Sequence, residues 1–134
     1  MWEKKEPVFG DQIKVNRGFY SHHGIYASND CVIHFAPPGN TGTLDPSAAR
    51  IITTTLDEFL NGGTLEVRTY TEDELKKRRA PNEIVNYALA HLGEGGYDLV
   101  SNNCEHFSNM CAFGTKSSDQ VESVLSFLFG GVKR

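Results

Sequence analysis

The first half of the chain contains short runs in which apolar and polar positions alternate, the pattern typical of half-buried β-strands. Strands are predicted at residues 8–15, 24–27, 32–36, 49–54 and 65–69. Ser28, Asn29 and Asp30 separate the second and third of these runs and predict a hairpin turn between them. Residues 37–46 are rich in proline and glycine and predict a loop.

Helix signals begin at Thr55. Thr55 precedes Glu58 by three residues, and Thr71 precedes Glu74 in the same way, so two capping boxes predict two short helices. The glycines at residues 62–63 are expected to end the first of them.

Three further helices are predicted. One begins at Pro81 and ends at Gly93, a second covers residues 103–112, and a third, amphipathic helix covers residues 119–129. The apolar face of the first is formed by Ile84, Val85, Ala88, Leu89 and Leu92. Because strands come first and helices last, the order predicts an α+β fold, with a mainly antiparallel sheet packed against helices on one side.

Composition fits one globular domain spanning residues 1–134. The chain is 39% apolar and 22% charged, and its net charge of -4 gives no reason to expect nucleic acid as a partner. No signal peptide and no run of about 20 apolar residues is visible, so no transmembrane segment is expected. Three cysteines, an odd number, argue against a disulfide framework and for a reducing, cytoplasmic compartment.

Cys104 lies near the start of the predicted helix at residues 103–112. With Asn102 as the N-cap, Glu105 falls at the third helical position and closes a capping box. Cys104 is then in the first turn, where free backbone N–H groups and the helix dipole lower the pKa of a thiol and can receive an oxyanion. This setting makes Cys104 a candidate nucleophile.

Two alternatives exist for this cysteine. Composition alone gives a buried structural role equal weight, because free cysteine is among the most buried residue types. A zinc site built from Cys104, His106 and Cys111 fits no common ligand spacing. Cys111 and Cys31 are expected in the core.

His22 and His34 lie on the two arms of the predicted hairpin, where cross-strand neighbours can meet on one face. Beside a thiolate, one imidazole can take the thiol proton while the other fixes its tautomer. His23 points to the opposite face from His22, so only one of them can face Cys104, and periodicity does not decide which. The other two histidines are expected to be surface or capping residues.

Several segments together resemble the lecithin:retinol acyltransferase (LRAT)-like family, which includes the small phospholipase A/acyltransferases. This family belongs to the circularly permuted branch of the NlpC/P60 papain-like superfamily. The matching segments are residues 10–13, 19–26, 32–38 and 102–107, which contain the specific string Asn-Cys-Glu-His-Phe and two histidines twelve residues apart. They occur in family order within a core of about residues 8–114.

The resemblance implies a circularly permuted papain-like fold with the catalytic cysteine at a helix N-terminus. The implied catalytic residues are Cys104 as nucleophile, His22 as general base and His34 as third member, with Tyr20, His23 and Asn103 as oxyanion or accessory residues. His23 replaces a tryptophan of the family and is therefore a rival base. No counterpart is visible for the C-terminal membrane anchor of many animal members.

The expected activity is that of a thiol-dependent acyltransferase or phospholipase, which acts on glycerophospholipid esters through an acyl-cysteine thioester and needs no cofactor or metal. The alternatives are a papain-like cysteine amidase or peptidase, and a non-catalytic domain that binds lipid or protein. The apolar stripe of residues 121–129 is compatible with peripheral membrane contact, although such stripes more often pack on the core.

Overall fold

The computed structural model describes residues 1–18, 21–36, 48–96 and 103–114. The strands are β1 (Trp2–Glu3), β2 (Gln12–Asn16), β3 (Ser21–Ser28), β4 (Cys31–Ala36), β5 (Arg50–Thr54) and β6 (Leu65–Arg68). The helices are α1 (Leu56–Leu60), α2 (Glu72–Lys77), α3 (Pro81–Ala90) and α4 (Cys104–Phe113). The loop expected at residues 37–46 and the helix expected at residues 119–129 both lie entirely outside the described residues.

The described strands form one antiparallel sheet in the order β1-β6-β2-β3-β4-β5. The α+β class predicted from the order of elements is therefore confirmed, as is the β3–β4 hairpin. Both capping boxes are present, at Thr55 before α1 and at Thr71 before α2.

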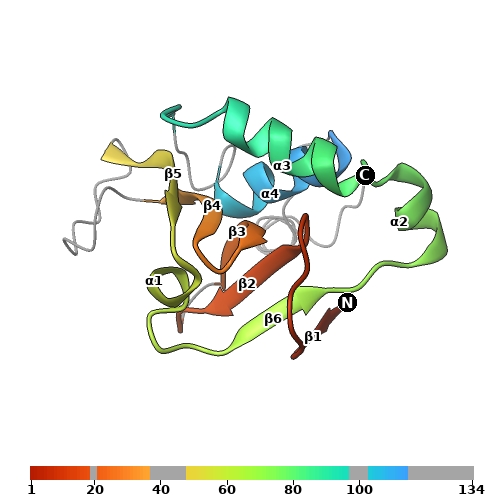
Figure 1. Ribbon diagram of the computed structural model, residues 1–134, viewed down its shortest axis with the longest axis horizontal. Coiled ribbons are helices and arrows are strands. Elements are labelled where there is room, and N and C mark those ends of the chain that lie inside the picture. The colour runs from red at the N-terminus through yellow and green to blue at the C-terminus, as the bar shows by residue number, and fades with distance from the viewer. Residues whose placement is uncertain (19–20, 37–47, 97–102, 115–134) are drawn as a thin grey trace, which may run out of the picture.

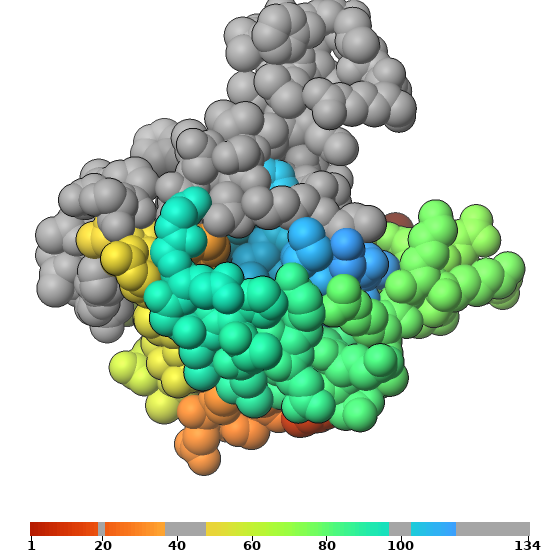
Figure 2. Space-filling view, turned by 90° about the horizontal axis from the view of Figure 1, so that it is seen from above, coloured from red at the N-terminus to blue at the C-terminus, as the bar shows by residue number. Residues whose placement is uncertain are grey.

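Helices cover both faces of the sheet, so the expectation of helices on one side is wrong. Along β4, Ile33 packs with residues of α3 and α4, whereas its neighbour Val32 packs with Phe59 of α1. Because adjacent strand residues point to opposite faces, these two clusters form two separate cores. Figure 1 shows α3 and α4 together on one side of the sheet and α1 apart from them. In Figure 2, α3 covers much of the face seen from above, and the visible part of α4 lies next to it.

Two details of the predicted elements are wrong. The first expected strand begins only at Gln12, because the backbone turns at residues 8–11, where Asp11 N donates to Val8 O and Gly10 has a φ of 89°. Helix α3 ends at Ala90, so Leu92 lies beyond it. Leu89 and Leu92 are 38% and 43% exposed rather than buried, since the sheet and α4 cover only the side of Ile84 and Ala88. Strand β1 had no signal in the sequence pattern.

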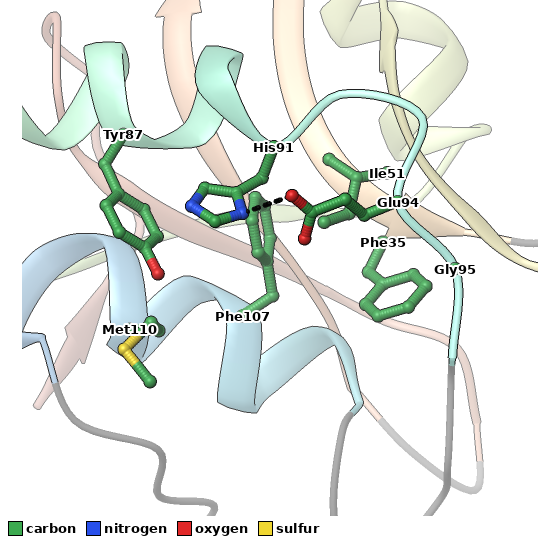
Figure 3. Close-up of a pocket in the computed structure, with 8 residues that line it drawn as sticks. All are labelled: Phe35, Ile51, Tyr87, His91, Glu94, Gly95, Phe107 and Met110. Atoms are coloured by element: carbon green, nitrogen blue, oxygen red, sulfur yellow. Dashed lines mark hydrogen bonds and ion pairs between the residues drawn. The ribbon is translucent and has the colours of Figure 1, made fainter.

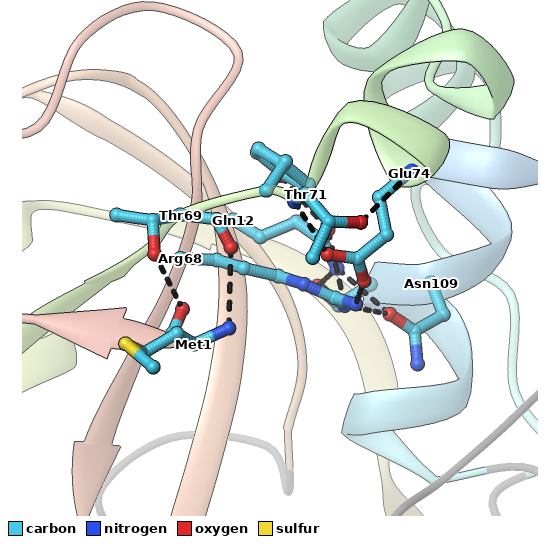
Figure 4. A network of polar contacts seen from close by, with 9 residues as sticks. Met1, Gln12, Arg68, Thr69, Thr71, Glu74 and Asn109 are labelled. Atoms are coloured by element: carbon cyan, nitrogen blue, oxygen red, sulfur yellow. Dashed lines mark hydrogen bonds and ion pairs between the residues drawn. The ribbon is translucent and has the colours of Figure 1, made fainter.

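A buried polar network fixes α4 against the sheet (Figure 4). The Gln12 side chain is 1% exposed; its Nε2 donates to Ser108 Oγ (2.8 Å) and Asn109 Oδ1 (2.9 Å), and its Oε1 accepts from the Tyr70 hydroxyl (2.9 Å). Arg68 donates a further bond of 2.9 Å to Asn109 Oδ1. Because buried polar groups are costly when unpaired, these bonds favour one position of α4, and hence of Cys104 at its start.

Candidate active site

The two histidines of the hairpin meet, as predicted. Pairing of Ile25 with Ile33 in β3 and β4 sets the register that places His22 and His34 on the same face of the sheet. His22 Nε2 and His34 Nδ1 are 2.8 Å apart, and both side chains are buried. Since His22 Nε2 is engaged in this bond, Nδ1 is the nitrogen of His22 that remains to act as a base.

Phe59 of α1 holds this pair from the face opposite to α4. Its ring stacks on His22, with centroids 5.2 Å apart, and meets the edge of His34 at 5.1 Å. Gly24 makes room for it, because a Cβ at this position would come within 2.8 Å of the Phe59 ring. The sequence pattern gave no reason to connect Phe59 with the histidines.

Thr54 is a second contact that the sequence analysis missed. Its Oγ1 lies 3.0 Å from His34 Nε2, so three side chains form one hydrogen-bonded row from β3 through β4 to β5. The strand alternation of residues 49–54 could have placed Thr54 on a face but not next to a particular histidine.

Cys104 is the first residue of α4, one position nearer the helix start than expected. The N-cap is Asn103, not Asn102, and the third helical residue is His106, not Glu105. Asn103 Oδ1 accepts from His106 N at 3.0 Å, while His106 Nδ1 accepts from Asn103 N at 3.1 Å. Asn103 and His106 therefore set where the helix begins, which confirms His106 as a capping residue.

The thiol of Cys104 lies against the backbone on both sides of His22. Sγ is 3.9 Å from Ser21 O, and the backbone N–H of His23 lowers the Cys104 pKa. Among the described residues, no hydrogen bond links this sulfur to an imidazole. The backbone N–H and C=O of Tyr26 bond to the segment that leads into β2. Successive residues of an antiparallel strand bond alternately to its two neighbours, so the backbone groups of Ser21 and His23 point towards β4 instead. The thiol is thus on the side of β3 that faces β4.

Burial overturns the expected electrostatics of the thiol. Cys104 is 3% exposed, and its burial raises the pKa of the thiol to about 11 against the opposing effect of the N–H groups of His23, Glu105 and Cys104 itself. The expectation of a lowered pKa is therefore wrong for the free protein. The helix start supplies the predicted donors, but the loss of solvent outweighs them. In this state the sulfur carries its proton at neutral pH.

The three candidate histidines are neutral at the same pH. Burial, reinforced by His34, Arg17 and His23, holds the pKa of His22 well below its ordinary value. Burial and then Arg17 lower the pKa of His34 to about 4 against the pull of Glu58. A neutral imidazole can accept a proton, so the pair keeps the form needed for general-base catalysis.

His23 lies on the α4 face of the sheet, opposite to His22. Its ring contacts Trp2 at 5.5 Å, and burial lowers its pKa to about 4 although Glu105 opposes this shift. It has no contact with His34. The arrangement separates the two adjacent histidines, with only His22 belonging to the hydrogen-bonded row.

We expect the stability of the protein to fall as pH drops from about 6.5 to 4. His23 and His34 bind protons at about pH 4 when folded but near 6.5 when unfolded, so acid favours the unfolded chain by on the order of 2–3 kcal/mol per imidazole. Urea unfolding at pH 7.0, 5.5 and 4.5 measures the change. His34→Asn should flatten this dependence. An equal unfolding free energy at all three pH values would contradict the burial argument.

Tyr20, expected to help with the oxyanion, lies outside the described residues.

A cavity of about 170 Å³ lies between α3 and α4 (Figure 3). It is lined by Phe35, Ile51, Tyr87, His91, Glu94, Gly95, Phe107 and Met110. His91 Nδ1 and Glu94 Oε2 pair across 2.7 Å at this cavity, which contains neither Cys104 nor the candidate histidines.

The described part of the chain lacks two kinds of feature, a metal-binding cluster and a membrane-spanning helix. No three His, Cys, Asp or Glu side chains in it are grouped so as to hold a metal ion. None of its helices has the length and apolar character needed to cross a bilayer.

These residues define an α+β protein with a buried thiol at a helix start and a hydrogen-bonded histidine pair on the adjoining strands. The family model for lecithin retinol acyltransferase matches residues 5–117, which is most of the chain. The chain therefore belongs to the lecithin retinol acyltransferase family, as the motifs predicted.

Curated relatives agree with this assignment. Human phospholipase A and acyltransferase 3 is 32% identical over 130 residues, which cover 90% of this chain and 79% of that protein. Rat lecithin retinol acyltransferase is 30% identical over 132 residues, or 84% of this chain and 57% of that protein. Human phospholipase A and acyltransferase 5 is 31% identical over 138 residues, and the match spans 91% of this chain but about half, 46%, of that longer protein.

Proposed function

We propose that this protein is a thiol-dependent phospholipase and acyltransferase, which acts on glycerophospholipid esters through a thioester on Cys104. The observation that carries the proposal is the position of the Cys104 thiol against the backbone on both sides of His22, whose Nε2 is bonded to His34. Family membership and the names of the relatives support the ester substrate.

Proton transfer and attack are coupled in this mechanism, because the resting thiol is protonated and the imidazole neutral. His22 Nδ1 takes the thiol proton as Sγ attacks the ester carbonyl carbon, and the carbonyl electrons move to its oxygen. His22 then protonates the leaving lysophospholipid oxygen as the C–O bond breaks, which leaves the acyl group on sulfur. Water or an amine, deprotonated by His22, attacks the thioester and releases the thiol.

The start of α4 provides the donors for the oxyanion. The N–H groups of Cys104 and Glu105 lie in the first turn of α4, and both already favour a negative charge on Sγ. A donor of this kind contributes roughly 3 kcal/mol to the transition state. In our proposal Tyr20 adds a further donor, by its match to the family tyrosine.

The wider proposal is a circularly permuted papain-like fold of the NlpC/P60 type, because the histidine strands precede the cysteine helix in the chain. Residues 1–134 form one LRAT-like domain in this account. The free state of all three cysteines supports a reducing, cytoplasmic location, with contact to the membrane surface where the lipid substrate resides.

Two panels of substrates test this function against the amidase alternative. The protein is incubated with phosphatidylcholine or phosphatidylethanolamine vesicles and, separately, with peptide and isopeptide substrates. We expect free fatty acid or N-acyl product from the lipids and no peptide cleavage. Peptide cleavage without lipid turnover would make the protein a peptidase, and turnover of neither would support a binding role.

A further inference from the structure

We propose that Thr54 is a positioning residue that keeps His22 in the tautomer able to accept the thiol proton, acting through His34. This inference rests on the proposed function of Cys104 and His22. Thr54, on β5, would thus join the three residues of the proposed site, which are His22 on β3, His34 on β4 and Cys104 on α4.

The register of the sheet builds the contact. Thr54 pairs with Val32 and Ile52 pairs with His34, so Thr54 lies two residues along β5 from the position opposite His34 and on the same face. Its Oγ1 is 3.0 Å from His34 Nε2, and His34 Nδ1 is 2.8 Å from His22 Nε2. Each ring nitrogen of His34 therefore has one hydrogen-bond partner.

The role of Thr54 follows from which nitrogen carries the hydrogen at each step of this row. If His22 is to accept a proton at Nδ1, its Nε2 must carry the hydrogen and donate to His34 Nδ1. His34 then carries its own hydrogen on Nε2 and donates to Thr54 Oγ1. In the reverse arrangement Thr54 donates to His34, His34 donates to His22 Nε2, and the hydrogen of His22 sits on Nδ1, where no proton can be accepted.

The same direction is required after proton transfer. The imidazolium of His22 has hydrogens on both nitrogens, so its Nε2–H must donate to His34 Nδ1, and the chain must end on an acceptor. Thr54 Oγ1 is that acceptor, and its own hydrogen can point elsewhere. Loss of the hydroxyl would leave a buried N–H of His34 without a partner while a charge forms on His22.

The surrounding charges make this acceptor more important. Arg17, held by a 2.7 Å bond to Phe59 O just after β2, disfavours a positive charge on both His22 and His34. His23 on β3 has the same effect on His22, whereas Glu58 on α1 favours a charge on His34. Since most of these groups oppose the imidazolium, a hydrogen-bond acceptor at the end of the row supports its formation.

Thr54→Val tests the proposal, because valine keeps the shape and removes the acceptor. We expect kcat/KM for phospholipid hydrolysis to fall about tenfold or more. The acid limb of its pH profile, where His22 becomes protonated, should lie about one unit lower, because the imidazolium is less stable. Thr54→Ser should restore both values. Thr53→Val, at the exposed neighbouring residue on the opposite face, is the matched control and should match the parent. An unchanged acid limb in Thr54→Val, or failure of serine to restore it, would overturn the role of Thr54.

A second measurement separates this inference from the proposed function. Nitrogen-15 NMR of the imidazoles reports which ring nitrogen carries the hydrogen whether or not the protein turns over lipid. The parent should have hydrogen on Nε2 of both His22 and His34, and Thr54→Val should show a mixture or the reverse. Identical tautomers in the two proteins would refute the inference, whereas a parent without lipid turnover would refute only the function.

Discussion

Replacing Cys104 with alanine is expected to abolish phospholipid hydrolysis and acyl transfer, with a loss of at least about 1000-fold in kcat. The reason is chemical, because alanine has no atom able to form the acyl bond, and a protein that works through a thioester has no second route of comparable speed. Release of fatty acid from mixed phospholipid vesicles measures the loss. The change removes one buried sulfur, so the fold should persist, and circular dichroism and urea unfolding verify this.

Cys31→Ala is the matched control for this experiment. Cys31 is also a free cysteine, but it lies at the turn of the β3–β4 hairpin, and its side chain is only partly buried. We expect it to keep the parent rate within a factor of about two. Full activity in folded Cys104→Ala would reject Cys104 as the nucleophile.

Replacing His22 with glutamine should lower kcat/KM by about 100- to 10,000-fold, whereas His23→Gln should lower it less than tenfold. Glutamine can hydrogen-bond but cannot take the thiol proton, so this substitution removes the base and keeps much of the packing. The structure favours His22 because its ring belongs to the row with His34 and Thr54, whereas the His23 ring lies on the α4 face beside Trp2.

Comparing the two variants identifies which of the adjacent histidines is the base, whichever of them is inactive. Unfolding measurements on each variant exclude a simple loss of structure. If His23→Gln were the inactive variant and His22→Gln the active one, the base would be His23, with Glu105 as its electrostatic partner. The row from His22 to Thr54 would then be structural.

The sequence predicted the elements whose signals are local. The two capping boxes and the alternation in β3 and β4 each depend on a few adjacent residues, and all appear in the fold. Helix α3 ends at Ala90, three residues before the glycine that was expected to end it. The pairing of His22 with His34 was also predictable, because a hairpin with a short turn limits which side chains can meet.

The start of α4 could not be chosen from the sequence. Asn102 and Asn103 are both good caps, and each is followed three residues later by a side chain able to close a capping box. The structure uses Asn103 with His106, which makes Cys104 the first helical residue. Local propensity is nearly equal for the two choices, so the packing of α4 on the sheet decides between them.

The burial of the Cys104 side chain could not be predicted from the local sequence pattern either. A cysteine in the first helical turn predicts a lowered pKa only if water or a cation also reaches it, and here the surrounding core raises the value instead. In the same way, Thr54 and Phe59 enter the site through contacts between β4, β5 and α1. Such contacts depend on the strand order and on which face each helix covers.

Intact mass spectrometry after brief exposure to mixed phospholipids detects the proposed thioester on Cys104. We expect a mass increase equal to one fatty acyl group less one hydrogen. The adduct should map to the peptide that contains Cys104, be removed by neutral hydroxylamine and be absent from Cys104→Ala. Release of fatty acid with no acylated protein at any time point, or an adduct on Cys31 alone, would contradict it.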